Sequence, residues 1–281
     1  MALILKNETF AQLYKNVLFN CLNNYEYESK PRNLKIYEIT NVCLELTTPY
    51  YNWFSNEYRK DIDKYLKGEL IWYFTGDKNI EFIGKYSSFW KKIANSDGTA
   101  NSAYGNLIFR RKNEYNFTEW GWAIQSLKDD KDSRQAIMHF NTPDHLFLSN
   151  KDQVCTMYGI FLIRNNRLNF HVYMRSNDVI KGLTYDVPFF TLLQVEAWKI
   201  LVKQYPKLML GSYFHNATSL HLYENDVSLS KQIISSDVKF DMVPGTDLSL
   251  VDEYGYCRKE FFEVINKSYV GNAKFFNWLQ E

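Results

Sequence analysis

The spacing of hydrophobic residues along the chain predicts alternating helices and strands. Apolar residues recur every three or four positions in several segments, the pattern of a helix with one buried face. The predicted helices are residues 8–22, 60–75, 118–128, 187–204 and 258–267. Shorter apolar runs, some of them alternating with polar residues, predict strands at residues 35–45, 135–140, 208–214 and 219–223. The fold class is therefore α/β (α+β).

Local signals at the element ends support these assignments. Asn7 or Thr9 has the side chain to cap the first helix, and Thr75-Gly76-Asp77 is typical of a helix end. Pro188 suits the first turn of the helix at 187–204, where a missing N–H costs nothing.

Two polar stretches lack a periodic pattern. Residues 95–105 are small and polar and contain Gly98 and Gly105, so a loop is expected there. Residues 227–252 are polar as well and are expected to be rich in loops. No internal repeat and no linker is present, so residues 1–281 are interpreted as a single domain.

A β-hairpin is predicted around Asn165-Asn166, because asparagine tolerates the positive φ of a two-residue turn. One strand begins just after Cys155, and the other ends at Met174, before Arg175-Ser176-Asn177-Asp178. Past Gly182 the chain adds Asp186, so the hairpin would set a thiol beside an arginine, a serine and two carboxylates. These groups suit a site that holds a phosphorylated small molecule and attacks it with sulfur.

Composition narrows the function classes. The chain has 281 residues, 46% of them hydrophobic, which is typical of a globular protein. A net charge of +1 argues against a long nucleic-acid or membrane surface. Apolar runs fall short of the ~20 residues of a membrane span, and the first residues do not resemble a signal peptide. A cytoplasmic protein is expected (host cytoplasm if it is viral).

The cysteines and histidines do not suggest a metal centre. Four cysteines are far apart with no CxxC pair, and the five histidines show no HExxH spacing. Neither a metal nor a disulfide is expected. Cys21 lies on the apolar stripe of the first helix and Cys43 in a predicted strand, so both are interpreted as small buried side chains.

Several candidate residues have an ordinary structural alternative. Arg134 and Arg175 each adjoin a serine, which suits a phosphate but also occurs in surface loops. Asp186 precedes Val187-Pro188 and would serve equally as a helix N-cap. For Glu69 the structural alternative is a solvent-exposed residue on the surface of a helix. His221 and Tyr223 share one face of a strand and together could bond a sugar hydroxyl.

Taken in order, several segments resemble the thymidylate synthase superfamily, and more closely its deoxycytidylate (dCMP) hydroxymethylase branch. These segments are residues 68–77, 88–90, 103–105, 132–134, 154–156, 174–186 and 219–223. The motif-bearing core spans about residues 60–225, whereas residues 226–281 diverge. The resemblance implies a large bent mixed β-sheet flanked by helices, in a homodimer whose sheets pack back to back.

The resemblance also implies roles for individual residues. Cys155 would add to carbon 6 of a pyrimidine, and the co-substrate would be 5,10-methylenetetrahydrofolate. Glu69, Asp186 and His221 would share the catalytic work with Cys155. The nucleotide monophosphate would be held by Arg175, Ser176, Asn177, Asp186, His221 and Tyr223, with Arg134 contributed across the dimer interface. The folate would be held by Trp90, Asp178, Gly182 and Tyr185.

Departures from the synthase pattern indicate the base. Synthases that use deoxyuridylate carry asparagine where this chain has Asp186, and a carboxylate suits the amino group of cytosine. Thr156 follows Cys155 where synthases have histidine, as in the hydroxymethylase branch. Gln135 replaces a second phosphate-binding arginine, which removes one charge from that site.

The expected activity is the 5-hydroxymethylation of dCMP with methylenetetrahydrofolate and water. Hydroxymethylation of dUMP or CMP, or methylation of dUMP by a thymidylate synthase, remain alternatives. A non-catalytic nucleotide-binding relative is the alternative from a different class.

Overall fold

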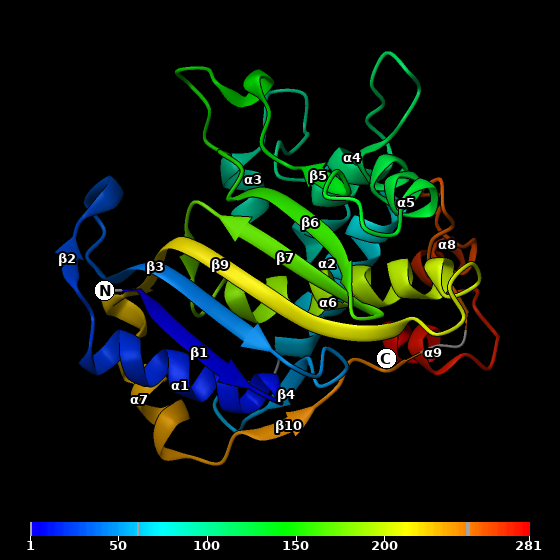
Figure 1. The fold of residues 1–281 in the computed structure, drawn as a ribbon. Helices are drawn as coiled ribbons and strands as arrows, with labels where there is room; N and C mark the ends of the chain where they lie inside the picture. Colours follow the sequence, from blue (N-terminus) through cyan, green and yellow to red (C-terminus); the bar gives the residue numbers. More distant parts are fainter. Residues whose placement is uncertain (1, 61, 246–247) are drawn as a thin grey trace. The chain divides into compact units, whose positions relative to one another are not determined.

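The computed structural model describes residues 2–60, 62–245 and 248–281. Figure 1 shows its helices and strands, coloured along the sequence from blue at the N-terminus to red at the C-terminus. The α-helices are α1 (Phe10–Asn23), α2 (Ile62–Thr75), α3 (Phe89–Ile93), α4 (Tyr104–Phe109), α5 (Glu119–Asp129), α6 (Leu183–Leu201), α7 (Val227–Ser235), α8 (Glu260–Ile265) and α9 (Lys274–Gln280). The strands are β1 (Leu3–Asn7), β2 (Tyr27–Ser29), β3 (Ile36–Leu46), β4 (Trp53–Ser55), β5 (Ile137–His139), β6 (Thr156–Arg164), β7 (Arg167–Met174), β8 (Asn177–Asp178), β9 (Met209–Tyr223) and β10 (Lys239–Asp241).

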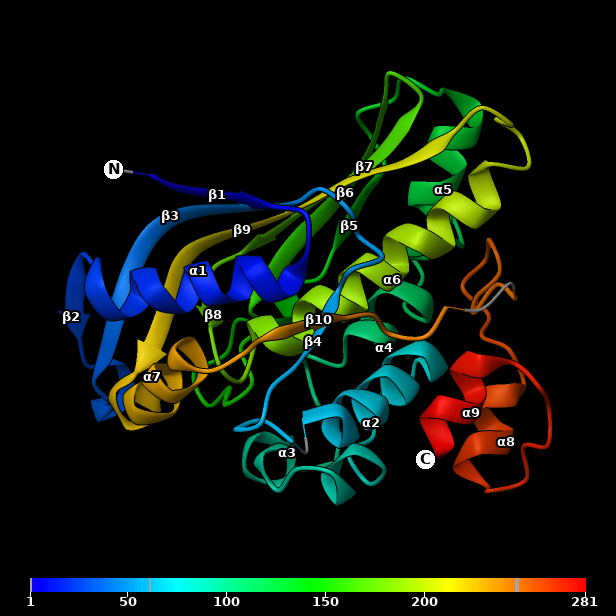
Figure 2. The same ribbon diagram turned by 90° about the horizontal axis from the view of Figure 1, so that it is seen from below.

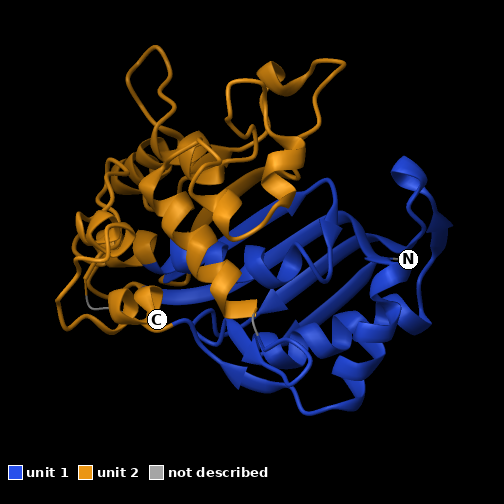
Figure 3. Cartoon of the chain, turned by 180° about the vertical axis from the view of Figure 1, so that it is seen from behind, with its two compact units in different colours: residues 1–60, 167–195, 209–243 blue, residues 61–166, 196–208, 244–281 orange. Residues whose placement is uncertain are grey.

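The chain divides into two compact units that alternate along the sequence (Figure 3). Unit 1 contains residues 1–60, 167–195 and 209–243, and unit 2 contains residues 61–166, 196–208 and 244–281. The expectation of one catalytic domain with a motif-bearing core at about 60–225 stays a prediction.

Unit 1 is built on a mixed sheet. The long strand β9 pairs antiparallel with β3 and parallel with β7, and β3 also pairs parallel with β1. The short strand β8 adds to β9 in parallel, so that Asn177 lies opposite Leu220 and Asp178 opposite His221. This register brings the segment after β7 beside the end of β9.

Helix α1 covers one face of these strands. Its apolar stripe, which includes Phe10, Tyr14 and Cys21, is buried. The helix lies against β1, β3 and β9, and Figure 2, seen from below, shows it along one face of these strands. Thr9 caps the helix by accepting the N–H of Gln12 at 3.3 Å, which confirms one of the two expected caps. A fully buried Cys21 likewise confirms the expected small core side chain.

Unit 2 has an aromatic core formed by its helices. Phe74 of α2 stacks against Phe261 of α8 at 5.4 Å between ring centres, and Phe261 also meets Phe276 of α9 edge to face. Gly76 ends α2 with φ of 69°, as expected from the sequence. Residues near the C-terminus thus contribute directly to the core, because their rings fill space beside α2.

Several predicted boundaries are wrong. Helix α6 begins at Leu183 rather than 187, so Pro188 lies inside it and Asp186 belongs to the helix itself. The two strands expected at 208–214 and 219–223 are one strand, β9. Gly105 lies in α4 rather than in a loop. It sits where a Cβ atom would lie 1.6 Å from the carbonyl oxygen of Tyr73, so close helix packing requires glycine.

Two further expectations need correction. The segment 227–252 is not only loops, because it forms α7 and β10, and β10 pairs antiparallel with β4. Cys43 is half-buried rather than fully buried, because strand alternation places it between the buried Val42 and Leu44.

The two-residue turn is confirmed, since Asn165 and Asn166 have φ of 51° and 55°.

Candidate functional site

Unit 1 brings together residues from β8, α6 and β9. Asp178 is held by an Asx turn in which its Oδ1 accepts the N–H groups of Ile180 at 2.7 Å and Lys181 at 3.0 Å. The β8–β9 register places Asp178 opposite His221. Two predicted site residues, 43 positions apart in sequence, are therefore neighbours because of one short parallel strand.

The electrostatics of this pair follow from burial. Burial raises the pKa of Asp178, and burial lowers the pKa of His221, while the Asp178 carboxylate acts on His221 in the opposite direction. His221 is only 7% exposed, and among the described residues its Nδ1 atom has no hydrogen-bond partner. A buried ring nitrogen of this kind is suited to a hydroxyl or a water molecule that arrives with a ligand.

Asp186 lies in the first turns of α6 and is half-buried. Its Oδ2 atom accepts a hydrogen bond from Asn177 Nδ2 at 2.7 Å. Desolvation raises the pKa of Asp186 from its ordinary 3.8 to about 7; the Asn177 bond opposes this shift, and the nearby Asp178 carboxylate adds to it. Near neutral pH the Asp186 carboxyl group is thus divided between its protonated and ionised forms.

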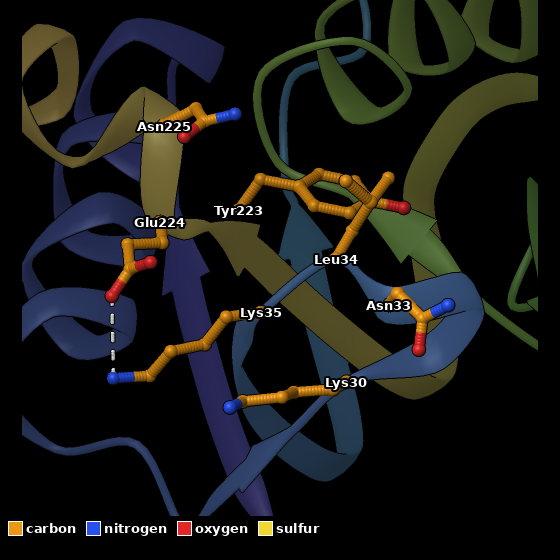
Figure 4. Close-up of a pocket in the computed structure, with 7 residues that line it drawn as sticks. All are labelled: Lys30, Asn33, Leu34, Lys35, Tyr223, Glu224 and Asn225. Atoms are coloured by element: carbon orange, nitrogen blue, oxygen red, sulfur yellow. Dashed lines mark ion pairs between the residues drawn. The ribbon is translucent and has the colours of Figure 1, made fainter.

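Tyr223, at the end of β9, lies against the ring of His221, with the two planes at 85° and the centres 5.2 Å apart. It also lines a cavity of about 260 Å³ together with residues of the 30–35 loop (Figure 4). In that cavity Lys35 forms an ion pair with Glu224 at 3.3 Å. Arg32 of the same loop is held in the left-handed region, with φ of 53°, and its charge lowers the pKa of His221.

Unit 2 holds Glu69 in a network of phenols. Tyr65, Glu69 and Tyr73 are spaced by four on α2 and so share one face of the helix. Glu69 is 7% exposed, and its Oε1 accepts the hydroxyl groups of Tyr65 at 2.8 Å and Tyr73 at 3.3 Å. The alternative of a solvated Glu69 is wrong, because the carboxylate is buried and bonded.

Trp90 is connected to the same network. Its indole Nε1 donates to the Tyr65 hydroxyl at 3.0 Å, and its ring meets Trp72 edge to face at 4.7 Å. Trp90 is only 4% exposed, and its indole N–H helps to position Tyr65 and thereby Glu69.

Cys155 stands immediately before β6 and is half-buried. Its Sγ lies 4.0 Å from the carbonyl oxygen of Gln153. Thr156 next to it is fully buried, and among the described residues its hydroxyl has no hydrogen-bond partner. The start of a strand fixes the backbone of Cys155 while leaving part of its side chain accessible.

The two candidate phosphate arginines are both exposed. Arg134 lines a groove of about 680 Å³ in unit 2, with Tyr115, Trp122 and Gln135 among the other lining residues. Trp122 Nε1 donates to the backbone oxygen of Gln135 at 3.0 Å, which fixes the backbone of this segment. Arg175 follows β7 in unit 1, next to the half-buried Ser176.

Within unit 1 the structure therefore groups Asn177, Asp178, Asp186, His221 and Tyr223, and within unit 2 it groups Glu69 with Trp90. Gly182 belongs to the first group for a reason the sequence did not reveal. A Cβ atom there would lie 2.8 Å from Asn177 Nδ2, so the missing side chain makes room for that amide. Tyr185 lies one turn further along the chain, half-buried at the start of α6.

Sequence reasoning missed four residues that bond to these groups. Tyr65 and Tyr73 donate to Glu69, His215 Nε2 lies 3.2 Å from Asn177 Oδ1, and the Tyr213 hydroxyl lies 2.8 Å from His215 Nδ1. The two on α2 had a usable signal, because they flank Glu69 at four-residue spacing. The sequence signal for Tyr213 and His215 on β9 was weaker. These two residues and His221 are separated by even numbers of positions, which places them on one face of the strand.

The chain is similar in sequence to known proteins. The family model described as thymidylate synthase matches residues 14–266. The deoxycytidylate 5-hydroxymethyltransferase of Enterobacteria phage T4 is 32% identical over 171 residues, which cover 57% of this chain and 67% of that protein. The deoxyuridylate hydroxymethyltransferase of Bacillus phage SP01 is 26% identical over 227 residues, covering 76% of this chain and 57% of that protein.

A solved structure shows the same fold. The thermostable thymidylate synthase A from Bacillus subtilis superposes with a TM-score of 0.68 at 18% identity, covering 88% of this chain and 91% of the other. The expected fold class is confirmed. The family match and the phage hydroxymethyltransferase relatives support an enzyme that transfers one-carbon groups. The chain belongs to the thymidylate synthase family.

Within residues 2–60, 62–245 and 248–281, no group of three or more metal-ligating side chains converges on a point. In the same described ranges, no helix combines the length and the apolar character needed to cross a bilayer.

Proposed function

We propose that this enzyme hydroxymethylates dCMP at carbon 5, using 5,10-methylenetetrahydrofolate and water. The half-buried Asp186 carboxyl group carries the proposal, because its pKa is raised to about 7 and Asn177 fixes one of its oxygens. Cytosine offers an amino group that donates and a ring nitrogen that accepts. A carboxyl group that shares a proton with the base bonds both.

The same carboxyl group discriminates against uracil. Uracil presents a carbonyl oxygen and a ring N–H where cytosine presents an amino group and a bare nitrogen. An ionised Asp186 would face the carbonyl oxygen with like charge, which costs on the order of 1–3 kcal/mol when the groups are buried. The names of the phage relatives are consistent with either a cytosine or a uracil substrate.

In the proposed reaction each catalytic side chain has a distinct role. The Cys155 thiolate adds to carbon 6 of the pyrimidine, which makes carbon 5 a nucleophile for the one-carbon unit that the folate supplies. Glu69, held by two phenols, moves protons near carbon 5 and orders a water molecule. His221 Nδ1 is available to bond that water or the sugar hydroxyl. Loss of the carbon-5 proton and release of tetrahydrofolate leave a methylene group on carbon 5, water adds to it to give the hydroxymethyl group, and the Cys155 sulfur leaves carbon 6.

The folate-binding assignments fit the chemistry of the residues present. A pterin presents N–H donors along one edge, and the half-buried Asp178 carboxyl group beside the side-chain-free Gly182 offers a complementary acceptor. Tyr185 would supply aromatic surface, and the buried Trp90 would support the folate site from behind through its bond to Tyr65. Arg175, Ser176 and Tyr223 would hold the nucleotide, and Arg134 would reach the phosphate from the partner subunit of a homodimer.

Product analysis tests the proposal. The enzyme is incubated with dCMP, dUMP or CMP and labelled methylenetetrahydrofolate, and the nucleotide product is identified by mass. We expect 5-hydroxymethyl-dCMP as the main product, without the rise in near-ultraviolet absorbance that accompanies dihydrofolate formation. Methylated dUMP as the main product would reject the proposal in favour of a thymidylate synthase.

Exchange at carbon 5 tests the covalent step separately. Tritium at carbon 5 of dCMP is expected to be released to solvent by the native enzyme. Cys155→Ser is expected to slow this release by more than ~10³-fold while dCMP still binds. If the native enzyme binds dCMP but never releases tritium, the non-catalytic nucleotide-binding alternative is favoured.

A further inference from the structure

A chain of hydrogen bonds runs from the core of unit 1 to Asp186. The Tyr213 hydroxyl lies 2.8 Å from His215 Nδ1, and His215 Nε2 lies 3.2 Å from Asn177 Oδ1. Asn177 Nδ2 then donates to Asp186 Oδ2 at 2.7 Å. Tyr213, His215 and Asn177 are each at most 3% exposed, so the network is shielded from water up to Asp186. We refer to these three residues as the relay.

The donor and acceptor of each hydrogen bond in the relay follow from the chemistry of the Asp186 carboxylate and the His215 imidazole. An ionised carboxylate only accepts, so the amide N–H of Asn177 must face Asp186 and its oxygen must face His215. His215 Nε2 therefore carries a hydrogen. Burial lowers the pKa of His215 to about 3, which keeps the imidazole neutral. Its Nδ1 is then bare and accepts the Tyr213 hydroxyl, so all three donors point toward Asp186.

The packing around the relay fixes the amide of Asn177 in place. Strand β8 holds its backbone against Leu220 of β9. Gly182 leaves the space that the amide fills, because a Cβ there would lie 2.8 Å from Nδ2. Two separate elements therefore make room for a side chain whose only described polar contacts are His215 and Asp186.

We propose that Tyr213, His215 and Asn177 are positioning residues. They determine which oxygen of Asp186 accepts a hydrogen bond and which oxygen carries the proton, and we call this order the polarity of the carboxyl group. They reserve Oδ2 as an acceptor, so that the proton of the neutral carboxyl group lies on Oδ1. The carboxyl group then presents one acceptor and one donor in a fixed order, which complements cytosine and opposes uracil. This inference rests on the proposed function, which assigns base recognition to Asp186.

The hydrogen bonds of the relay could instead all run in the opposite direction, and an experiment can distinguish the two directions. If Asp186 carried its proton on Oδ2, the Asn177 amide would be reversed and would donate to His215 Nε2. His215 would then hold its hydrogen on Nδ1. The two polarities predict different tautomers of one neutral histidine, and this difference does not depend on any catalytic activity.

Nitrogen-15 NMR of the full-length protein labelled at histidine distinguishes the tautomers. We expect His215 to stay neutral with its hydrogen on Nε2 between about pH 6 and pH 8. Tyr213→Phe removes the donor to Nδ1 and is expected to add a population with the hydrogen there. An Nδ1-protonated His215 in the native protein, or an imidazolium in that pH range, would overturn the proposed polarity.

Paired variants test the effect on base choice. His215→Gln retains an acceptor for Tyr213 and a donor for Asn177, whereas His215→Phe retains a ring but neither group. We expect His215→Phe to lower the ratio of kcat/KM for dCMP over dUMP by about 10–100-fold and to shift its pH profile, and His215→Gln to restore most of the ratio. Circular dichroism checks that each variant folds, and Tyr213→Phe provides the same comparison if His215→Phe does not.

The outcomes separate the two proposals. If the native enzyme does not use dCMP, the proposed function fails, and the tautomer measurement still tests the relay. If the native enzyme prefers dCMP and folded His215→Phe keeps the same preference and pH profile, the relay has only a structural role and this inference is wrong.

Discussion

Replacing Asp186 with asparagine is expected to stabilise the protein while damaging its base recognition. The fold raises the pKa of this carboxyl group from 3.8 to about 7, chiefly through desolvation. A raised pKa means that the folded state favours the protonated form. The stability associated with that form is fully present below about pH 3.8 and is lost as the pH rises through about 7.

The size of the effect follows from the shift. A difference of about three pH units at about 1.4 kcal/mol per unit gives about 4 kcal/mol. Because Asp186 keeps part of its surface exposed, solvent screening reduces this figure, and we expect about 2–4 kcal/mol. An asparagine bears no charge at any pH, and its side-chain oxygen still accepts the hydrogen bond from Asn177.

Urea unfolding at several pH values provides the measurement. Asp186→Asn should have nearly the same free energy of unfolding as the native protein at about pH 4, and an advantage of about 2–4 kcal/mol at about pH 8. Asp237→Asn is the control, because Asp237 is an exposed aspartate of the same unit. The change in the stability difference between about pH 4 and about pH 8 should be larger for Asp186→Asn than for this control. A pH-independent difference for Asp186→Asn would refute the reasoning.

Three further substitutions test other parts of the structure. Glu69→Gln should lower tritium release from carbon 5 of dCMP by about 10²–10⁴-fold, since it removes the carboxylate that moves protons; unchanged release would exclude that role. Gly105→Ala should destabilise the protein by about 3 kcal/mol or more in urea unfolding, because its Cβ would overlap the Tyr73 carbonyl. Phe261→Ala should cost about 3–5 kcal/mol in the same assay, because its fully buried ring packs against Phe74 and Phe276; a near-neutral result would contradict a core role for the C-terminal segment.

The candidate residues were recognised from ordered motifs, but their immediate environments were not. Glu69 was expected on a helix and is there, yet whether it faces solvent depended on neighbours outside its own turn. Trp90, 21 positions away, donates to Tyr65 and completes the network around Glu69. Local sequence does not report burial when the covering residues come from another element.

Asp186 shows the same limit more sharply. From sequence it was either an N-cap or a reader of the base. The start of α6 at Leu183 removes the first option, and β8 pairing brings Asn177 beside the carboxylate. The raised pKa depends on that packing, so no residue pattern alone could have predicted it.

Sequence by itself determined the mixed α/β class, the apolar faces of α1 and α2, the Asn165-Asn166 turn and the identity of the chemical groups. These features depend on periodicity and backbone preference, which are local properties. Tertiary structure alone decided how far α6 and β9 extend and which side chains surround Glu69 and Asp186. Those outcomes depend on contacts between residues far apart in the chain, where burial and hydrogen bonding set the charge and orientation of each group.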